Sequence, residues 1–293
     1  MTMPATRRLG RYEVAPLAWG MWRYRGDDVR AARMLVETAL ETGMTLFDTA
    51  DVYGPDNGEA FGAAESLLGR VFAEAPGLRD RMVLASKGGI VPGTPYNSSA
   101  AYLVEACEAS LKRLRVERLD LYQIHRPDLL AHPAEVAEAF AKLRAAGKIA
   151  EAGVSNYTAA QARALGAHMP FALASTQPEF SPLAIAPLSD GVLDHALETG
   201  LAVLAWSPLG GGRLSADPRG AVAQALDTLA RREGVPLSAI AYAWIMAHPS
   251  GAIPIVGSQQ PARIREAAAA LKVRLTRADW YAVLTAARGE PLP

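Results

Sequence analysis

Short apolar stretches alternate with amphipathic helical stretches along the chain, and this repetition restricts the possible folds more than any other feature of the sequence. The apolar stretches have the length of buried strands, and the helical stretches carry apolar residues at spacings of three and four. Such alternation predicts a parallel sheet covered by helices. Strands are expected at residues 17–20, 45–48, 82–87, 119–124, 149–154, 172–177, 201–206 and 252–255.

Capping residues mark the helix boundaries between these strands. Asp27 or Asp28 is expected to cap the first helix, and Gly43 to end it. Ser98 or Ser99 is expected to cap the third helix, which continues to about residue 114. The other helices are expected at residues 59–72, 133–147, 159–167, 190–199, 219–233, 237–247, 262–271 and 276–287.

Eight strand–helix units in 293 residues are accommodated most economically by one closed barrel, since the (β/α)8 fold has a similar typical length. The sequence therefore predicts an α/β protein with a single TIM-barrel domain over residues 1–293. A hairpin is expected around Arg8–Val14, with extra helices near the C-terminus. An open, doubly wound sheet is the alternative, and the lack of a Gly-x-Gly-x-x-Gly segment after an early strand counts against it.

Charge and cysteine content exclude several functional classes. Thirty basic and 30 acidic residues give zero net charge, which does not favour nucleic acid or an anionic membrane as partner. The single cysteine, Cys107, excludes an internal disulfide and a cysteine-based zinc site, and its helical spacing predicts a buried thiol. The first residues lack the apolar segment of a signal peptide, and no run of about 18 apolar residues occurs. We therefore expect a cytoplasmic protein and, without an obvious exposed apolar stripe, a monomer.

Polar side chains occur where the predicted strands end. Asp48 ends the second strand and Tyr53 follows it, Lys87 ends the third strand, and His125 follows the fourth. Residues just past the strands of a barrel meet at one rim, so these four side chains are expected to lie together. Each has a structural alternative: a turn cap for the aspartate, packing for the tyrosine, a solvated or paired lysine, and a structural histidine. All four alternatives would have to coincide at one rim, which favours a catalytic site.

These four residue types suit proton transfer to a carbonyl oxygen. A free tyrosine has a pKa of about 10, which is too high for efficient proton donation at neutral pH. The Lys87 ammonium is expected to lower the pKa of Tyr53, and Asp48 to keep that lysine charged and in place. His125 can orient the substrate oxygen. No metal is required, and because no serine or cysteine nucleophile is evident, a hydride donor is the expected reactant.

Further residues at the same rim fit a nicotinamide dinucleotide. Ser155, Asn156 and Gln177 suit the carboxamide of the nicotinamide, and Trp206 can stack on its ring. The Gly210–Gly212 loop permits close approach of the backbone to a phosphate. The alternatives are helix capping for the serine–asparagine pair and barrel packing for the tryptophan.

The segment after the last strand is expected to bind the remainder of the cofactor. Gly257 and Ser258 precede the last barrel helix, whose N-terminus favours an anion. Arg213 can assist at the glycine loop. Arg263 and Arg265 lie on that helix, and an arginine there can bind a 2′-phosphate, which favours NADP(H) over NAD(H). A solvent-facing position without a ligand is the alternative for each arginine.

Together these segments resemble the aldo-keto reductases, from about residue 17 to residue 272 and in the family's order. The resemblance implies a (β/α)8 barrel that binds NADPH in an extended form and reduces aldehydes and ketones. The segments that carry it are Asp48-x4-Tyr53, Ser86-Lys87, Gln123-Ile124-His125, Gly153-Val154-Ser155-Asn156-Tyr157, Trp206-Ser207-Pro208-Leu209, and Gly257-Ser258 with Arg263.

The resemblance also implies residue roles. Tyr53 is the general acid, Lys87 and Asp48 tune it, and His125 orients the carbonyl group. Trp206 takes the stacking position, at which many members have a tyrosine. The implied cofactor contacts are Ser155, Asn156, Gln177, Trp206, Ser207, Leu209, Gly211, Arg213, Gly257, Ser258, Gln259 and Arg263.

Two positions depart from the family pattern. Gly257 replaces a lysine that many members carry, and Ala267 replaces an asparagine. The expected preference for NADP(H) therefore depends on Ser258, Gln259 and Arg263.

The substrate is less restricted by the sequence. The loops at 22–26, 88–97 and 179–188 match no member whose substrate can be carried over. Trp22 and Tyr24 are expected to line the pocket, which favours a small apolar or aromatic carbonyl compound. Two other functions stay open: a Schiff-base lyase with Lys87 as an unpaired, neutral lysine, and an accessory or sensor protein that binds nucleotide on the same barrel.

Overall fold

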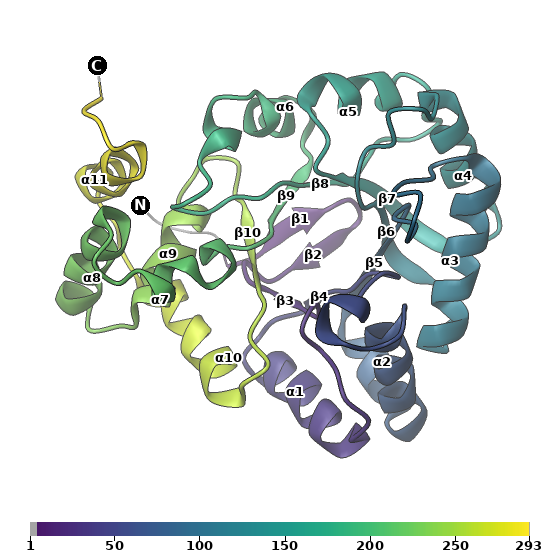
Figure 1. Cartoon of the computed structure of the whole chain (residues 1–293), viewed down its shortest axis with the longest axis horizontal. Helices are drawn as coiled ribbons and strands as arrows, with labels where there is room; N and C mark the ends of the chain where they lie inside the picture. The colour runs from purple at the N-terminus through teal and green to yellow at the C-terminus, as the bar shows by residue number, and fades with distance from the viewer. Residues whose placement is uncertain (1–4, 293) are drawn as a thin grey trace.

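Eight parallel strands close into a barrel in the computed structural model, which describes residues 5–292. Each strand lies beside its neighbours in sequence, and the last strand pairs with the first, so the barrel prediction is confirmed and an open sheet is excluded. Figure 1 shows the helices as a ring around these strands. The barrel strands are β3 (Ala18–Gly20), β4 (Leu46–Asp48), β5 (Val83–Gly88), β6 (Leu119–Ile124), β7 (Ile149–Ser155), β8 (Ser175–Gln177), β9 (Ala202–Ala205) and β10 (Ile253–Val256).

The helices agree with the predicted positions to within a few residues. Asp28 and Ser99 are the N-caps of the first and third helices, each accepting a hydrogen bond from a backbone N–H in the first turn. The helix predicted from residue 59 begins only at Ala63, because its N-cap, Gly62, has a left-handed backbone with φ of 78°. The helices are α1 (Val29–Glu41), α2 (Ala63–Glu74), α3 (Ala100–Leu114), α4 (Pro133–Ala145), α5 (Ala159–Gly166), α6 (Val192–Thr199), α7 (Arg213–Ala216), α8 (Ala221–Glu233), α9 (Leu237–Met246), α10 (Pro261–Ala267) and α11 (Arg277–Arg288).

An antiparallel hairpin covers the N-terminal end of the barrel. Its strands are β1 (Arg7–Leu9) and β2 (Tyr12–Val14), which confirms the predicted hairpin. Leu9 and Val14 are buried against apolar side chains of the barrel interior, and Figure 1 shows the hairpin across the centre of the barrel. Since this end is covered, the opposite end is the one that a ligand can enter.

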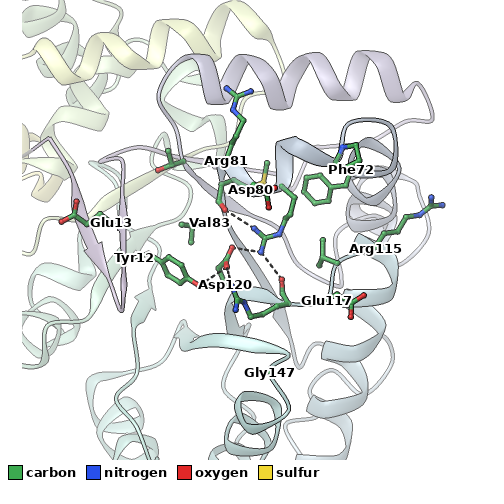
Figure 2. A pocket seen from close by; sticks show the side chains of 16 residues that line it. Tyr12, Glu13, Phe72, Asp80, Arg81, Val83, Arg115, Glu117, Asp120 and Gly147 are labelled. Carbon is green, nitrogen blue, oxygen red and sulfur yellow. Dashed lines mark hydrogen bonds and ion pairs between the residues drawn. The ribbon is translucent and has the colours of Figure 1, made fainter.

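A groove of about 880 Å³ lies beside the hairpin, at the N-terminal ends of β5 and β6 (Figure 2). Asp120 lies within it, accepts a hydrogen bond from Tyr12 Oη at 3.0 Å and pairs with Arg79 at 2.8 Å. The Asp120 carboxylate also accepts a hydrogen bond from the backbone N–H of Leu84, at 2.8 Å. These interactions join the hairpin to the strands, so we assign the groove a structural role distant from the polar rim.

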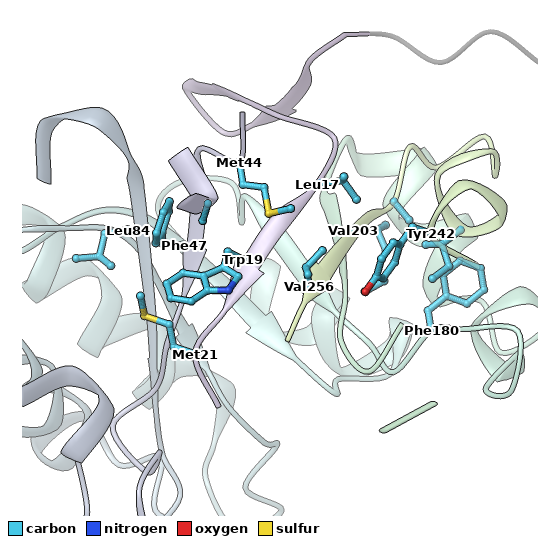
Figure 3. Packing of buried hydrophobic residues seen from close by; sticks show 14 of the residues in the cluster. Leu17, Trp19, Met21, Met44, Phe47, Leu84, Phe180, Val203, Tyr242 and Val256 are labelled. Carbon is cyan, nitrogen blue, oxygen red and sulfur yellow. The ribbon is translucent and has the colours of Figure 1, made fainter. Parts of the chain in front are cut away.

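Alternation along the strands divides the core into two parts. Trp19, Phe47 and Leu84 belong to the layer between barrel and helices (Figure 3), whereas Leu46 and Ala85 belong to the cluster inside the barrel. Successive side chains of a strand point to opposite faces. Residues two positions beyond an inward-facing side chain therefore also face inward, which directs the residues at the ends of β4 and β5 into the barrel.

Candidate active site

Lys87 is the centre of a buried polar cluster at the C-terminal ends of β4 and β5. Its ammonium donates hydrogen bonds to Asp48 Oδ2 at 2.7 Å, to the backbone oxygen of Thr49 at 2.9 Å and to Tyr53 Oη at 3.0 Å. Gln177 Nε2 on β8 donates to the other Asp48 oxygen at 3.0 Å. Lys87 has no exposed side-chain surface and Asp48 has 3 %. The structure thus brings three of the four predicted catalytic side chains into direct contact.

Burial and charge act in opposite directions on this cluster. Burial raises the pKa of the Tyr53 phenol above its ordinary value, and the Lys87 ammonium lowers it by less. The expected net lowering of the Tyr53 pKa is therefore wrong, although the lysine acts in the expected direction. Burial alone would lower the pKa of Lys87, but Asp48 and Tyr53 outweigh it and raise that pKa. At neutral pH the cluster thus holds a protonated phenol beside a charged lysine.

His125 lies across from the phenol and is neutral. The centroids of its ring and the Tyr53 ring are 5.8 Å apart, in an edge-to-face arrangement. Burial, followed by the charges of Lys87 and Arg126, lowers the pKa of His125 well below its ordinary value. Its Nδ1 is buried without a hydrogen-bond partner among residues 5–292, which leaves Nε2 as the nitrogen available to a ligand.

Three of the side chains expected around the nicotinamide, those of Ser155, Asn156 and Trp206, form one hydrogen-bonded network, which the backbone carbonyl of Gln177 joins. Asn156 donates to Ser155 Oγ at 2.9 Å and to the His125 carbonyl at 3.1 Å, and its own oxygen accepts from Trp206 Nε1 at 2.9 Å. Ser155 Oγ donates to the Gln177 carbonyl at 2.9 Å. The network joins the ends of β6, β7, β8 and β9, so these residues orient one another. Through His125 the network also reaches the four predicted catalytic side chains, Asp48, Tyr53, Lys87 and His125, which we call the tetrad.

A helix-capping role for the Ser155–Asn156 pair does not occur. Thr158 is the N-cap of α5, in a capping box with Gln161. Asn156 instead has a left-handed backbone with φ of 59°, and Ser207, beside Trp206, has φ of 48°. Non-glycine residues rarely adopt this conformation, and such residues often occur at functional sites.

Open space surrounds the residues expected to contact the cofactor phosphates. A Cβ added to Gly212 or Gly257 would meet no atom within 4 Å, and one added to Gly211 would meet only Ser207 Oγ, at 4.0 Å. Gly211 and Gly212 have φ of 67° and 102°, which side chains disfavour, whereas Gly257 has no such positive φ. A glycine there leaves the backbone open to a ligand. These glycines, at the entrance of a barrel closed at its other end, fit an extended dinucleotide.

The remaining predicted cofactor residues differ in their surroundings. Arg213 is exposed, donates to the Gly210 carbonyl at 2.9 Å and lies 3.5 Å from a Glu179 oxygen. Gln259 Nε2 donates to the Gly20 carbonyl at 3.0 Å, so part of its amide serves the fold. Arg263, on α10, is exposed and has no hydrogen bond or ion pair within the described chain. Leu209 is half-buried, and the Ser258 hydroxyl accepts from the backbone N–H of Gln260 at 3.2 Å.

The two aromatic residues expected to line the substrate pocket lie in different environments. Tyr24 is 2 % exposed and packs against Trp19, with 5.6 Å between ring centroids. It therefore belongs to the core. Trp22 is 41 % exposed, and its Nε1 donates to Asp56 at 3.1 Å. The two rings do not form one continuous apolar wall.

Sequence reasoning missed a second group of buried ionisable residues behind Lys87. Glu65 on α2 accepts from the Ser86 hydroxyl at 2.5 Å and pairs with Arg113 at 2.7 Å. Asp51 is 1 % exposed, and neither of its carboxylate oxygens has a partner among the described residues. Helical spacing buries Glu65 with its apolar neighbours, a signal that was available, whereas nothing local to Asp51 indicated its burial.

This burial makes stability sensitive to pH at Asp51. Burial, then the charge of Glu65, raises its pKa well above the ordinary 3.8, against the smaller effects of Arg113, the nearby backbone N–H of Val52, and Lys87. The folded state then binds this proton more tightly than the unfolded state, so stability from this group is present below about pH 4 and is lost as pH rises. Asp51→Asn, which cannot ionise, should exceed the wild type in free energy of unfolding by about 1–3 kcal/mol at pH 8.

Denaturant unfolding of both proteins at pH 8 and at pH 4 measures this difference. The advantage of Asp51→Asn should shrink as the pH falls. An advantage of equal size at both values would show that the carboxylate is not the destabilising group.

The described chain contains no cluster of three or more metal-ligating side chains. No helix between residues 5 and 292 is both long and apolar enough to cross a membrane. The side chains at the rim offer proton transfer, hydrogen bonding and stacking, which suit hydride chemistry on a carbonyl group.

Comparisons with known proteins agree with this geometry. A sequence model described as the aldo/keto reductase family matches residues 16–287. A 6-dehydroglucose reductase of Novosphingobium aromaticivorans is 53 % identical, over 99 % of this chain and 98 % of that protein. A 6-dehydroglucose reductase of Agrobacterium fabrum is 34 % identical over 96 % of each chain. A glycerol dehydrogenase structure from Gluconobacter oxydans superposes with a TM-score of 0.84 at 27 % identity, covering 99 % of this chain and 98 % of that one.

Proposed function

The chain belongs to the aldo/keto reductase family of nicotinamide-dependent oxidoreductases that act on carbonyl groups, and from this premise we propose its specific reaction. It reduces the aldehyde of a hydroxylated sugar, such as 6-dehydroglucose, to a primary alcohol. Tyr53 is the general acid, and NADPH is the preferred hydride donor. The observation that carries the proposal is the contact of Lys87 with both Asp48 and Tyr53.

Proton transfer from Tyr53 completes the reduction. The phenol proton moves from Oη to the carbonyl oxygen, which leaves a phenolate 3.0 Å from the Lys87 ammonium. Since the positive charge stabilises the phenolate directly, it lowers the free energy of the transition state as the proton leaves. Asp48, 2.7 Å from Lys87, keeps the lysine protonated and prevents it from rotating away.

His125 positions the carbonyl oxygen. An imidazole that is neutral carries one N–H and one lone pair. The buried Nδ1 has no acceptor nearby, and buried N–H groups without acceptors are rare. This favours the tautomer with the proton on Nε2, which can donate to the carbonyl oxygen while Tyr53 approaches it.

The hydride comes from the reduced nicotinamide when the cofactor is bound. Ser155, Asn156 and Gln177 would hold its carboxamide, and the open backbone at Gly211 and Gly257 would accept its phosphates. The hydrogen-bonded network of the first three residues supports this assignment, because it fixes their side chains before the cofactor arrives.

The preference for NADPH is assigned to Arg263. Its guanidinium is exposed on α10 and has no protein partner in the described part of the chain, so it can pair with a 2′-phosphate in a charge-assisted contact. Arg263→Met should raise the Kd of NADPH about tenfold and that of NADH less than about twofold. Fluorescence titration with both nucleotides measures this, with Arg265→Met on the same helix as the control. An equal loss for both nucleotides would remove the assignment.

The substrate class rests on the relatives. Both 6-dehydroglucose reductases align over almost all of this chain, and 6-dehydroglucose carries an aldehyde on a ring with several hydroxyl groups. The core position of Tyr24 also removes half of the apolar wall that favoured an apolar substrate. The loss of NADPH absorbance in the presence of 6-dehydroglucose tests the proposal. If NADPH is oxidised no faster than in the absence of enzyme, the proposal is contradicted.

A Schiff-base lyase is disfavoured by the environment of Lys87. Such an enzyme needs a neutral amine, yet all three N–H donors of this lysine have acceptors and its pKa is raised. An accessory or sensor role has no specific support, because the tetrad is complete and assembled.

A further inference from the structure

Arg126 is a charged residue at the rim to which the proposed reaction assigns no role. It follows His125 directly after β6, and its guanidinium carbon lies 5.5 Å from the centroid of the Trp206 ring. Its positive charge acts on both proposed catalytic groups: it slightly opposes the rise that burial causes in the pKa of Tyr53, and it adds to the lowering of the pKa of His125 by burial and Lys87. The residue therefore lies at the mouth of the site and not on a remote surface.

Arg126 is a half-buried residue, yet its guanidinium has no hydrogen bond or ion pair within residues 5–292. Arg79 and Arg113 are also partly buried but have partners: Arg79 pairs with Asp120, and Arg113 pairs with Glu65 and also donates to Ser110. Arg144 resembles Arg126 in having only a ring contact, to Phe171, but it lies on α4 and not at the rim. Partly removing a guanidinium from water without a partner costs free energy. The Trp206 ring faces the guanidinium but accepts no conventional hydrogen bond, so the N–H donors of Arg126 remain for a ligand.

Nearby carboxylates are already engaged and do not compete for this arginine. Asp128 accepts from the backbone N–H groups of Ser98 and Leu130, each at 2.9 Å. Glu179, on the loop beside Trp206, lies 3.5 Å from Arg213. The donors of Arg126 consequently stay free for a molecule that enters the barrel.

A guanidinium presents five N–H donors in a planar fork and no acceptor. It binds oxygen acceptors, and it can make only weak contacts with the apolar part of an aldehyde that has no other oxygen. Because Arg126 is next to His125, an oxygen within its reach belongs to a part of the substrate close to the reacting carbonyl.

We propose that Arg126 determines specificity by binding a hydroxyl oxygen of the sugar, beyond the reacting carbonyl, and thereby selects hydroxylated over apolar aldehydes. This inference rests on the proposed reduction of a sugar aldehyde and extends it. Arg126 holds the substrate, while Tyr53 and His125 act on the carbonyl group.

Kinetics of Arg126→Met with two aldehydes tests the proposal. With 6-dehydroglucose, kcat/KM should fall roughly 10- to 100-fold, mainly through KM, as expected for the loss of a hydrogen bond to a charged group. With butanal, kcat/KM should change less than about threefold, because butanal has no hydroxyl group for the guanidinium to bind. The Kd of NADPH should change less than about twofold, because Arg126 is not among the proposed cofactor residues. Arg126→Lys retains the charge and should recover part of the loss with the sugar.

Arg81→Met is the matched control, because it removes one arginine at the opposite end of the barrel. It should leave both aldehydes unaffected. Thermal unfolding of each variant shows that the comparison is made on folded protein.

Several outcomes would overturn the inference. Equal losses with the sugar and with butanal would mean that Arg126 acts on the tetrad through its charge. A clear change in the Kd of NADPH in Arg126→Met, in either direction, would show that Arg126 contacts the cofactor. A wild type that prefers succinic semialdehyde, with this preference lost in Arg126→Met, would make a carboxylate the ligand.

The same assay separates this inference from the proposed function. If the wild type reduces 6-dehydroglucose and Arg126→Met reduces it equally well, only the role of Arg126 fails. A wild type that reduces butanal in preference to the sugar overturns both the substrate proposal and the role of Arg126. If none of the aldehydes causes the wild type to oxidise NADPH, the reductase proposal itself is contradicted.

Discussion

Tyr53→Phe should lower kcat for aldehyde reduction by roughly 10²- to 10⁴-fold, the range that a positioned general acid contributes. The substitution removes only the oxygen that lies 3.0 Å from Lys87. The ring stays, with its edge-to-face contact to His125 at 5.8 Å. Because the phenol is not among the residues expected to hold the cofactor, the Kd of NADPH should change less than about twofold.

Stopped-flow or steady-state loss of NADPH absorbance measures kcat, and fluorescence titration measures the Kd. Tyr12→Phe makes the same chemical change at the covered end of the barrel, where the hydroxyl binds Asp120. It should retain full turnover. Turnover that persists in Tyr53→Phe would exclude this phenol as the acid, whatever the family of the protein.

Lys87→Met should remove both activity and stability. The substitution leaves Asp48 buried with Gln177 as its remaining side-chain donor, and breaking a buried ion pair from one side costs about 3–5 kcal/mol of folding free energy. It also removes the charge that opposes the effect of burial on Tyr53. The phenol pKa should then rise further, and kcat should fall by at least about 10³-fold.

Lys142→Met is the control for the loss of a lysine, because Lys142 pairs with Glu138 on the exposed surface of α4. Such pairs contribute about 0.5 kcal/mol or less. Denaturant unfolding measures both variants. If Lys87→Met does not fold, Asp48→Asn examines the same pair with nearly unchanged shape and should also lose turnover. Normal stability together with normal turnover in both variants would exclude the role of the pair.

The strand positions were predictable because they depend on local sequence. Leu119–Ile124 was predicted residue for residue. β8 is shorter than predicted, since only Ser175–Gln177 joins the ladder. Once the strands are known, the period of two determines which side chains face inward, so Asp48 and Lys87 could be assigned to one interior from the sequence.

The hydrogen-bond partners and protonation states of these side chains could not be predicted from the sequence in the same way. The amide of Gln177 was expected to contact the cofactor, and nothing in the sequence indicated that its Nε2 also binds Asp48. Tyr24, six residues after the start of β3, turns into the core. Arg126 has no sequence signal that separates it from other arginines, because its half-buried place at the rim, without an acceptor among residues 5–292, arises only on folding.

The sequence by itself determined the closed barrel and the rim at which its polar residues gather, because strand length, helical spacing and alternation are local properties. Only the tertiary structure decided that burial outweighs Lys87 in its effect on Tyr53, that Asp51 lies buried without a partner, and that Arg126 has free donors. The physical reason is that solvation and electrostatic energy depend on distances between side chains from different strands and helices, and folding alone brings these side chains together.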